Sequence, residues 1–494
     1  MQSLVRKLLL GGLAGKALGA CREVVAAWCF GTGLVATAFR LSLSAFLLPL
    51  HGIVSDVTSG GFTPRYARLR LEDPKSAQQL FGALHSIFLS VSAAVAIVLL
   101  IATPPYVRLL APGIDQATLE QSVVFVRIMC AALPAYVLVS LYCAVELVHG
   151  KGSLTSMRAS WQSIGLLLGT LLAWAVGKPA LIALGFVTAY VGLAFFGALS
   201  CRSLGLDLWL DPRRALAAIP LLVPVVRVMK ILVWAPIVIQ VAQVVERRVA
   251  SNINPQAIAG IDYARFISET LLLLLAVPFA VAGQAAMPTM SQSEFEEQAK
   301  RSLLALAQLG LLCASFIFVH SQWIVSVLFQ RGAFDEVSTA ITSGMLSALS
   351  TGLPFALVAY AAQKFLNARG LNKAVVLTTL LGAAAGIALN LTCAKLLGPS
   401  VIGYATAVTA GVMCAGAVYC LGIGGPLGSG LKVWLITAAS HCALLLVARR
   451  YFDLPIFAEV AAGASVWASL FVFSPAARKS LLDIYLIVGR KVAH

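Results

Sequence analysis

The chain has 494 residues, of which 60% are hydrophobic and only 11% are charged, and its mean hydropathy is +0.91. Soluble domains carry about a quarter charged residues, so this composition excludes an ordinary soluble protein and indicates a polytopic membrane protein. The net charge of +16 is spread over many short loops, which argues against a nucleic-acid partner. The ten cysteines stand singly without a Cys-x-x-Cys pair, so we expect no disulfide framework, metal site or cofactor.

Hydrophobic runs of membrane-spanning length recur along the whole chain. At about 20 residues for each 30 Å crossing, they predict an all-α fold with about 14 transmembrane helices. We place these helices at about 3–30, 34–53, 79–104, 121–148, 156–176, 179–201, 216–245, 263–287, 302–328, 338–363, 373–395, 400–424, 431–448 and 454–474. Most Lys and Arg residues then lie on the side that holds both termini, which the positive-inside rule assigns to the cytoplasm. The largest polar loops, about 54–78 and 288–301, lie on that side.

Two halves of the chain share landmarks at one spacing. Leu133-Pro134 and Leu353-Pro354 are 220 residues apart, as are Gly150 and Gly370. The spacing indicates a duplicated unit of six helices, and an even number gives both copies the same orientation. Parallel repeats form two lobes around a central cavity. We therefore predict an N-lobe at 1–212, a C-lobe at 213–427, and a C-terminal helix pair with a cytoplasmic tail at 428–494.

Charges inside the predicted helices are the main functional signal. A charge at bilayer depth is costly unless it faces protein or water, so such residues are functional candidates. The first helix contains Lys16, Arg22 and Glu23, and the eighth contains Arg265 and Glu269. Lys16 and Glu23 are two turns apart and share a helix face, with Arg22 about 120° away, while Arg265 and Glu269 are four residues apart and can pair. We predict that the three cations line an anion-binding cavity, with the two carboxylates as possible charge partners.

Arg40, in the second predicted helix, is a further candidate for this cavity, although a structural role is equally compatible with its position. Arginine matches phosphate oxygens with paired donors, so these cations indicate an anionic passenger. The chain contains neither a P-loop pattern nor an acidic pair beside a nucleophile. These observations favour a transporter over an enzyme.

The same residues resemble the MviN/MurJ family of lipid II flippases, within the multidrug/oligosaccharidyl-lipid/polysaccharide exporter superfamily. The resemblance spans roughly residues 1–475, and its most specific element is the loop motif Arg331, Gly332, Phe334 and Asp335. The other matching stretches are Leu18-Gly19, Arg22-Glu23, Phe30-Gly31, Tyr263-Ala264-Arg265, Pro288-Thr289-Met290-Ser291, Phe365-Leu366-Asn367-Ala368-Arg369-Gly370, Asn390, Gly398 and Gly403.

The resemblance implies a flippase of the bacterial inner membrane that works by alternating access. Its substrate would be an undecaprenyl-diphosphate-linked saccharide, its surroundings membrane lipid, and its energy source a coupled ion or the membrane potential. The family's cavity cations map to Lys16, Arg22 and Arg265, and the final helix pair would form a groove for the lipid tail. Thr37 stands where the family usually has an acidic residue, and the arginines expected near the end of the second helix are absent. Both lipid II and an exopolysaccharide repeat unit therefore stay open as substrates.

Three alternatives remain from the sequence. A cation-coupled drug exporter of the same superfamily would need acidic residues deep in the cavity, where this chain has mainly cations. A membrane glycosyltransferase or polymerase would need a larger extramembrane loop. A transport-inactive membrane scaffold is compatible with the missing cavity charges.

Overall fold

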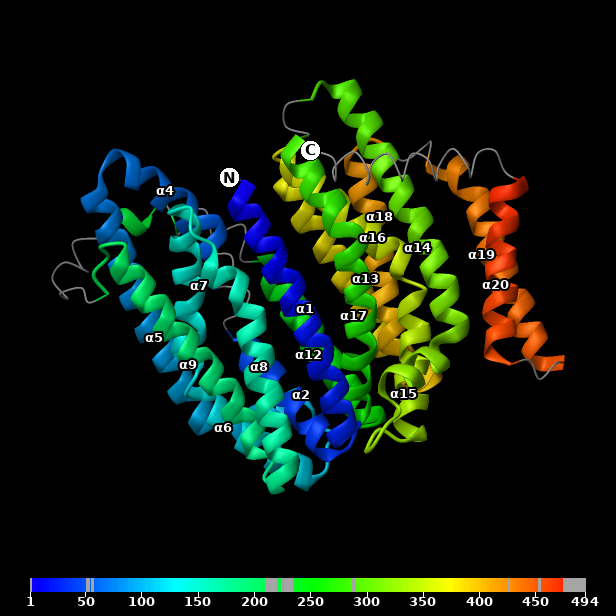
Figure 1. The fold of residues 1–494 in the computed structure, drawn as a ribbon, viewed down its shortest axis with the longest axis horizontal. Helices are drawn as coiled ribbons and strands as arrows, with labels where there is room; N and C mark the ends of the chain where they lie inside the picture. Colours follow the sequence, from blue (N-terminus) through cyan, green and yellow to red (C-terminus); the bar gives the residue numbers. More distant parts are fainter. Residues whose placement is uncertain are drawn as a thin grey trace. The chain divides into compact units, whose positions relative to one another are not determined.

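The computed structural model describes residues 2–49, 54, 57–208, 220–223, 225, 234–286, 290–423, 427–451 and 455–473, and all the regular elements among them are helices (Figure 1). Seven of these helices are long and apolar enough to cross a membrane, or up to nine if each of two bent pairs counts as one span. The chain is thus an all-α polytopic membrane protein. The count of 14 spans stays a prediction.

The helices form two compact units. The first contains residues 1–259 together with 329–338, and the second contains 260–328 and 339–494. Elements of the first unit are α1 (Gln2–Phe30), α2 (Leu34–Leu47), the π-helix η1 (Val57–Phe62), α4 (Thr63–Glu72), α5 (Pro74–Leu110), α6 (Gln116–Cys130), α7 (Leu133–Val148), α8 (Ser153–Val176), α9 (Ala180–Ser203) and α12 (Trp234–Ile253). The predicted boundary at 212 and 213 lies outside the described residues, and the three-part division stays a prediction.

The second unit takes most of α13 (Ala257–Ala286) and α14 (Gln292–Phe329), and the chain leaves it for residues 329–338. It continues with α15 (Glu336–Ser350), α16 (Leu353–Ala368), α17 (Asn372–Leu397), the short 3₁₀ helix η3 (Gly398–Ser400) and α18 (Val401–Cys420). The last two described helices are α19 (Leu427–Tyr451) and α20 (Ile456–Phe473).

The structure confirms the repeat at an offset of 220 residues. Helices α6 and α15 begin and end 220 residues apart, and so do α7 and α16. The two pairs bend by similar angles, 49° for α6–α7 and 54° for α15–α16. Both Gly150 and Gly370 follow the second helix with positive φ angles of 70° and 73°. The same local sequence signals therefore produce the same local structure twice.

The structure adds two details to the sequence prediction. The spans expected at 121–148 and 338–363 are each two helices, because Pro134 and Pro354 lie in the first turn of a new helix, where proline is favoured. The segments expected as polar loops at 54–78 and 288–301 contain η1, α4 and the first turns of α14.

Small residues set the closest helix contacts within each unit. Helices α8 and α9 pack through Gly165, Gly169 and Gly185, and a Cβ atom on Gly169 would lie 2.7 Å from the carbonyl oxygen of Leu181. Helices α17 and α18 repeat the arrangement with Gly382 and Gly386. This is the Gly-x-x-x-Gly packing that lets backbones approach each other in membranes.

Replacing Gly185 with alanine is expected to destabilise the first unit by about 1–3 kcal/mol, because the new methyl group would overlap the carbonyl oxygen of Gly165 on α8. Gly12→Ala in α1 is the matched control, since a Cβ atom there meets no atom within 4 Å. Thermal unfolding of both variants in detergent gives the measurement. Equal stability of the two variants would contradict the packing argument.

Candidate functional site

Two arginines from two helices converge on one buried carboxylate in the first unit. Glu23 of α1 is 2% exposed, and its Oε1 atom accepts a hydrogen bond of 3.2 Å from Nε of Arg22. The guanidinium of Arg40, on α2, forms a second ion pair with the other carboxylate oxygen. The exposed fractions of the Arg22 and Arg40 side chains are 22% and 11%. Two partly exposed guanidinium groups thus share one negative charge.

The turn between α1 and α2 brings Arg40 to Glu23. Gly31 allows this turn because its φ angle is +54°, a conformation that glycine adopts without strain. Thr37, which stands where the family usually has an acid, is 2% exposed and donates a 3.0 Å hydrogen bond to the carbonyl oxygen of Thr32. Thr37 therefore stabilises the turn between α1 and α2, and the carboxylate of the arginine cluster comes from Glu23.

Lys16 has a different environment from the two arginines. It lies on the exposed side of α1 and has no ion pair among the described residues. The sequence predicted that Lys16 and Glu23 share a helix face and that Arg22 lies about 120° away. The long Arg22 side chain nevertheless reaches the Glu23 carboxylate, so the arginines and not Lys16 neutralise Glu23.

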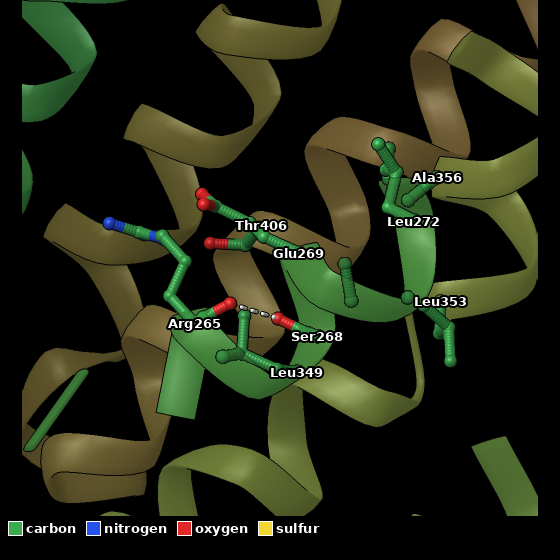
Figure 2. Close-up of a pocket in the computed structure, with 11 residues that line it drawn as sticks. Arg265, Ser268, Glu269, Leu272, Leu349, Leu353, Ala356 and Thr406 are labelled. Atoms are coloured by element: carbon green, nitrogen blue, oxygen red, sulfur yellow. Dashed lines mark hydrogen bonds between the residues drawn. The ribbon is translucent and has the colours of Figure 1, made fainter. Parts of the chain in front are cut away.

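Arg265 and Glu269 line a pocket of about 200 Å³ that lies wholly within the second unit (Figure 2). Ser268, in the same turn of α13, donates a 3.1 Å hydrogen bond to the backbone carbonyl of Arg265. Figure 2 shows the polar ends of Arg265, Glu269 and Thr406 on the same side of the pocket. The remaining lining is mainly apolar and comes from α13, α15, α16 and α18. The pocket thus offers one cation and a few polar groups in an apolar wall.

The loop motif between α14 and α15 is docked against the α1–α2 turn. The backbone N–H of Ala333 donates a 2.9 Å hydrogen bond to the carbonyl oxygen of Trp28, and Gly332 lies against the Trp28 side chain with a φ angle of +60°. Phe334 is 1% exposed and its ring centroid is 5.7 Å from that of Phe329. These contacts give Gly332 and Phe334 a structural role in fixing the loop.

Asp335 ends this loop and begins α15. Its Oδ1 atom accepts a 2.8 Å hydrogen bond from the backbone N–H of Ser338. Hydrogen bonds from the Ser338 hydroxyl and N–H lower the pKa of Asp335, which keeps this helix cap charged. Arg331, beside Gly332, is exposed.

Arg158 and Arg449 are partly buried cations that the sequence did not predict as candidates. Arg158 of α8 lies near the start of a predicted span, where a cation can reach the membrane surface, and it stands over the ring of Tyr136 at 5.4 Å. Arg449 of α19 was assigned to a loop, but its guanidinium binds Glu459 of α20 through two hydrogen bonds of 2.9 and 2.6 Å. Neither contact has a local sequence signal, because both join residues from different helices.

Comparison with known proteins supplies the family. The family model of lipid II flippase MurJ matches residues 26–472. This chain belongs to the MurJ family of lipid II flippases. A probable lipid II flippase MurJ from Rhizobium tropici is 26% identical over 488 residues, which covers 90% of this chain and 85% of that protein. The corresponding protein of Rhizobium meliloti is 25% identical and covers 92% of this chain and 88% of that protein.

Solved structures give the same fold. Lipid II flippase MurJ in an inward closed conformation aligns with a TM-score of 0.78 at 16% identity and covers 98% of this chain and 100% of that chain. A multidrug resistance MATE family transporter of the MOP superfamily aligns with a TM-score of 0.68 at 14% identity, covering 83% of this chain and 95% of that one. The cations that the sequence predicted to line the cavity are divided between the two units. Lys16 and Arg22 lie in the first unit, and Arg265 lies in the second.

Proposed function

We propose that this chain moves an undecaprenyl-diphosphate-linked saccharide, lipid II in the first instance, from the cytoplasmic to the periplasmic leaflet of the bacterial inner membrane. The observation that carries the proposal is the cluster of Arg22 and Arg40 around Glu23 in a chain of the lipid II flippase family. Within a membrane, charged groups are retained where they serve a passenger or a conformational switch. Two guanidinium groups with one shared carboxylate keep a net positive charge that suits a diphosphate.

Transport requires no covalent step from this chain. The diphosphate binds the guanidinium groups of Arg22 and Arg40 while the saccharide occupies an aqueous cavity. The polyprenyl tail stays in lipid along α19 and α20, where Leu435, Ile436 and Val447 are more than half exposed. Keeping the tail in lipid avoids a cost of about 0.8 kcal/mol for each CH₂ group moved into water.

Alternating access would then carry the headgroup across, with both termini on the cytoplasmic side. A coupled ion or the membrane potential would bias the cycle, since one charge crossing 100 mV changes the free energy by about 2.3 kcal/mol. Arg265 would contribute a cation from the second unit, and its place in one shared cavity with Arg22 stays a prediction. The drug-exporter alternative has only the common fold in its favour.

Complementation of a bacterium depleted of its own lipid II flippase tests the proposal. We expect the wild-type chain to restore growth and the Arg22→Ala, Arg265→Ala double variant to fail at equal expression. The control is the double variant Arg68→Ala, Arg301→Ala, which removes one exposed arginine from each unit; surface ion pairs of this kind contribute little. Failure of a correctly inserted wild-type chain to restore growth would count against lipid II and favour an exopolysaccharide repeat unit.

A further inference from the structure

Arg158 adds a cation from α8 to the charged residues of the first unit. Its guanidinium stands 5.4 Å from the centre of the Tyr136 ring, and Tyr136 in turn lies 5.0 Å from the Tyr190 ring. The Tyr190 hydroxyl donates a 3.1 Å hydrogen bond to Gln162, one turn beyond Arg158. No carboxylate in the part of the chain that the structure describes lies within ion-pair distance of Arg158. Among the described residues, the groups in contact with its guanidinium are therefore aromatic and neutral.

The packing of α1 on α8 brings the backbone at Arg158 close to the backbone at Lys16. Small residues meet along this seam, with a Cβ atom on Gly15 2.7 Å from Cβ of Ala159 and one on Gly19 3.8 Å from the Ser163 hydroxyl. The paired numbers rise together, so the two helices run in the same direction (Figure 1). Lys16 follows Gly15, and Arg158 precedes Ala159. Each residue is rotated by about 100° around its helix axis from the residue before it. Lys16 comes one residue after the contact point on α1, and Arg158 comes one residue before the contact point on α8. Because the two helices face each other, both cations then lie on the same side of the seam.

The first unit therefore carries cations at two levels along α1. Arg22 and Lys16 are six residues apart, which corresponds to about 9 Å along a helix. The outstretched guanidinium groups of Arg22 and Arg40 meet at Glu23, while Lys16 and Arg158 flank the Gly15 contact. Cations at two levels can bind two separate anionic groups of one headgroup. The level formed by Lys16 and Arg158 therefore suits a second anionic group in the same headgroup.

We propose that Lys16 and Arg158 bind a carboxylate of the saccharide or peptide part of the headgroup while Arg22 and Arg40 bind its diphosphate. This inference rests on the proposed function and adds a specificity for acidic headgroups to it. A carboxylate suits this pair because the planar guanidinium binds its two oxygens together, and the exposed ammonium of Lys16 adds a donor that can rotate. The Tyr136 ring, 5.4 Å from the guanidinium carbon, supports the cation.

The test compares two probes on the full-length chain in lipid nanodiscs: lipid II with free peptide carboxylates, and lipid II with those carboxylates amidated. We expect the wild type to bind the acidic lipid about tenfold more tightly, as befits one charge-assisted contact. Arg158→Gln and Lys16→Gln should each remove most of that preference by weakening binding of the acidic lipid alone. Arg158→Lys should keep part of the preference, because the positive charge remains. Arg40→Gln should weaken binding of both lipids.

The outcomes separate this inference from the proposed function. Equal wild-type affinity for the two lipids would overturn the carboxylate site while leaving the flippase proposal in place. Equal weakening of both lipids by Arg158→Gln would also overturn it, because a residue with a purely structural role would not distinguish the probes. Absence of wild-type binding to either lipid would overturn lipid II as the substrate in the proposed function, together with the inference.

Discussion

Arg449→Leu is expected to lower the free energy of unfolding of the second unit by about 1–3 kcal/mol, less than for a fully buried ion pair because the Arg449 side chain is 36% exposed. The substitution leaves Glu459, with a side chain only 7% exposed, without its arginine, so that Nδ1 of His320 at 3.7 Å is its remaining ion-pair neighbour among the described residues. It also removes the 2.6 Å hydrogen bond from Arg449 to the carbonyl oxygen of Val319. That carbonyl lies next to His320, where the helical backbone of α14 is interrupted with φ −101° and ψ 16°. Arg449 thus joins α14, α19 and α20 at a break in a helix.

Thermal unfolding in detergent, or digestion by a protease added under native conditions, measures this effect. The double variant Arg449→Leu, Glu459→Leu should recover much of the stability, because it leaves no buried charge without a partner. Arg301→Leu is the matched control, since Arg301 pairs with Glu297 on the exposed surface of α14. The account would be wrong if Arg449→Leu were as stable as Arg301→Leu, or if the double variant were less stable than the single one.

Glu23→Gln is expected to abolish transport and to strengthen binding of the diphosphate headgroup about tenfold. On the proposed function, Glu23, which pairs with Arg22 and Arg40, would compete with the passenger for these two guanidinium groups. A neutral amide leaves both groups without their shared carboxylate, so a bound anion is held more strongly and leaves more slowly. The chain would then stay loaded. Complementation reports transport, and lipid II affinity in nanodiscs reports binding.

Two further variants test the explanation. Glu23→Gln combined with Arg40→Gln restores the original balance of charge and should bring affinity back toward the wild-type value. Glu72→Gln removes a carboxylate from an exposed pair with Arg68 and should change neither measurement. Weaker binding by Glu23→Gln would show that the carboxylate organises the site and does not compete with the passenger.

Sequence periodicity predicted the repeated part of this fold well. The 220-residue offset of Leu133-Pro134 and Leu353-Pro354 reappears as matching helix ends and matching bends, because proline position and helix ends are local properties of the chain. The bends themselves were missed, since hydropathy alone does not distinguish one straight span from two short helices that meet at a proline. The helix α4 within the predicted 54–78 loop was missed for a similar reason, because a polar helix gives no hydropathy signal.

The sequence predicted individual residues of the candidate site but not the contacts between them. Lys16, Arg22 and Glu23 were identified from their position deep within the first predicted helix. A charged residue inside an apolar run can be recognised from the sequence even when its partner is unknown. The sequence did not identify Arg40 as the second partner of Glu23, since that contact joins residues 17 positions apart on different helices. Arg158 was missed because it lies near the end of a predicted helix. A long cationic side chain at such a position can extend to the polar membrane surface, so its charge does not indicate a buried site.

The amino-acid sequence by itself determined the membrane environment, the duplication and the presence of cations within the first helix. These follow from transfer free energies and local backbone preferences, which act on each segment separately. Tertiary structure alone decided which charges meet: Arg40 with Glu23, Arg449 with Glu459 and the break in α14, and Arg158 with Tyr136. The pairing of charges depends on which helix faces approach each other, and that depends on small residues such as Gly15 and Gly185, whose effect appears only when another helix packs against them.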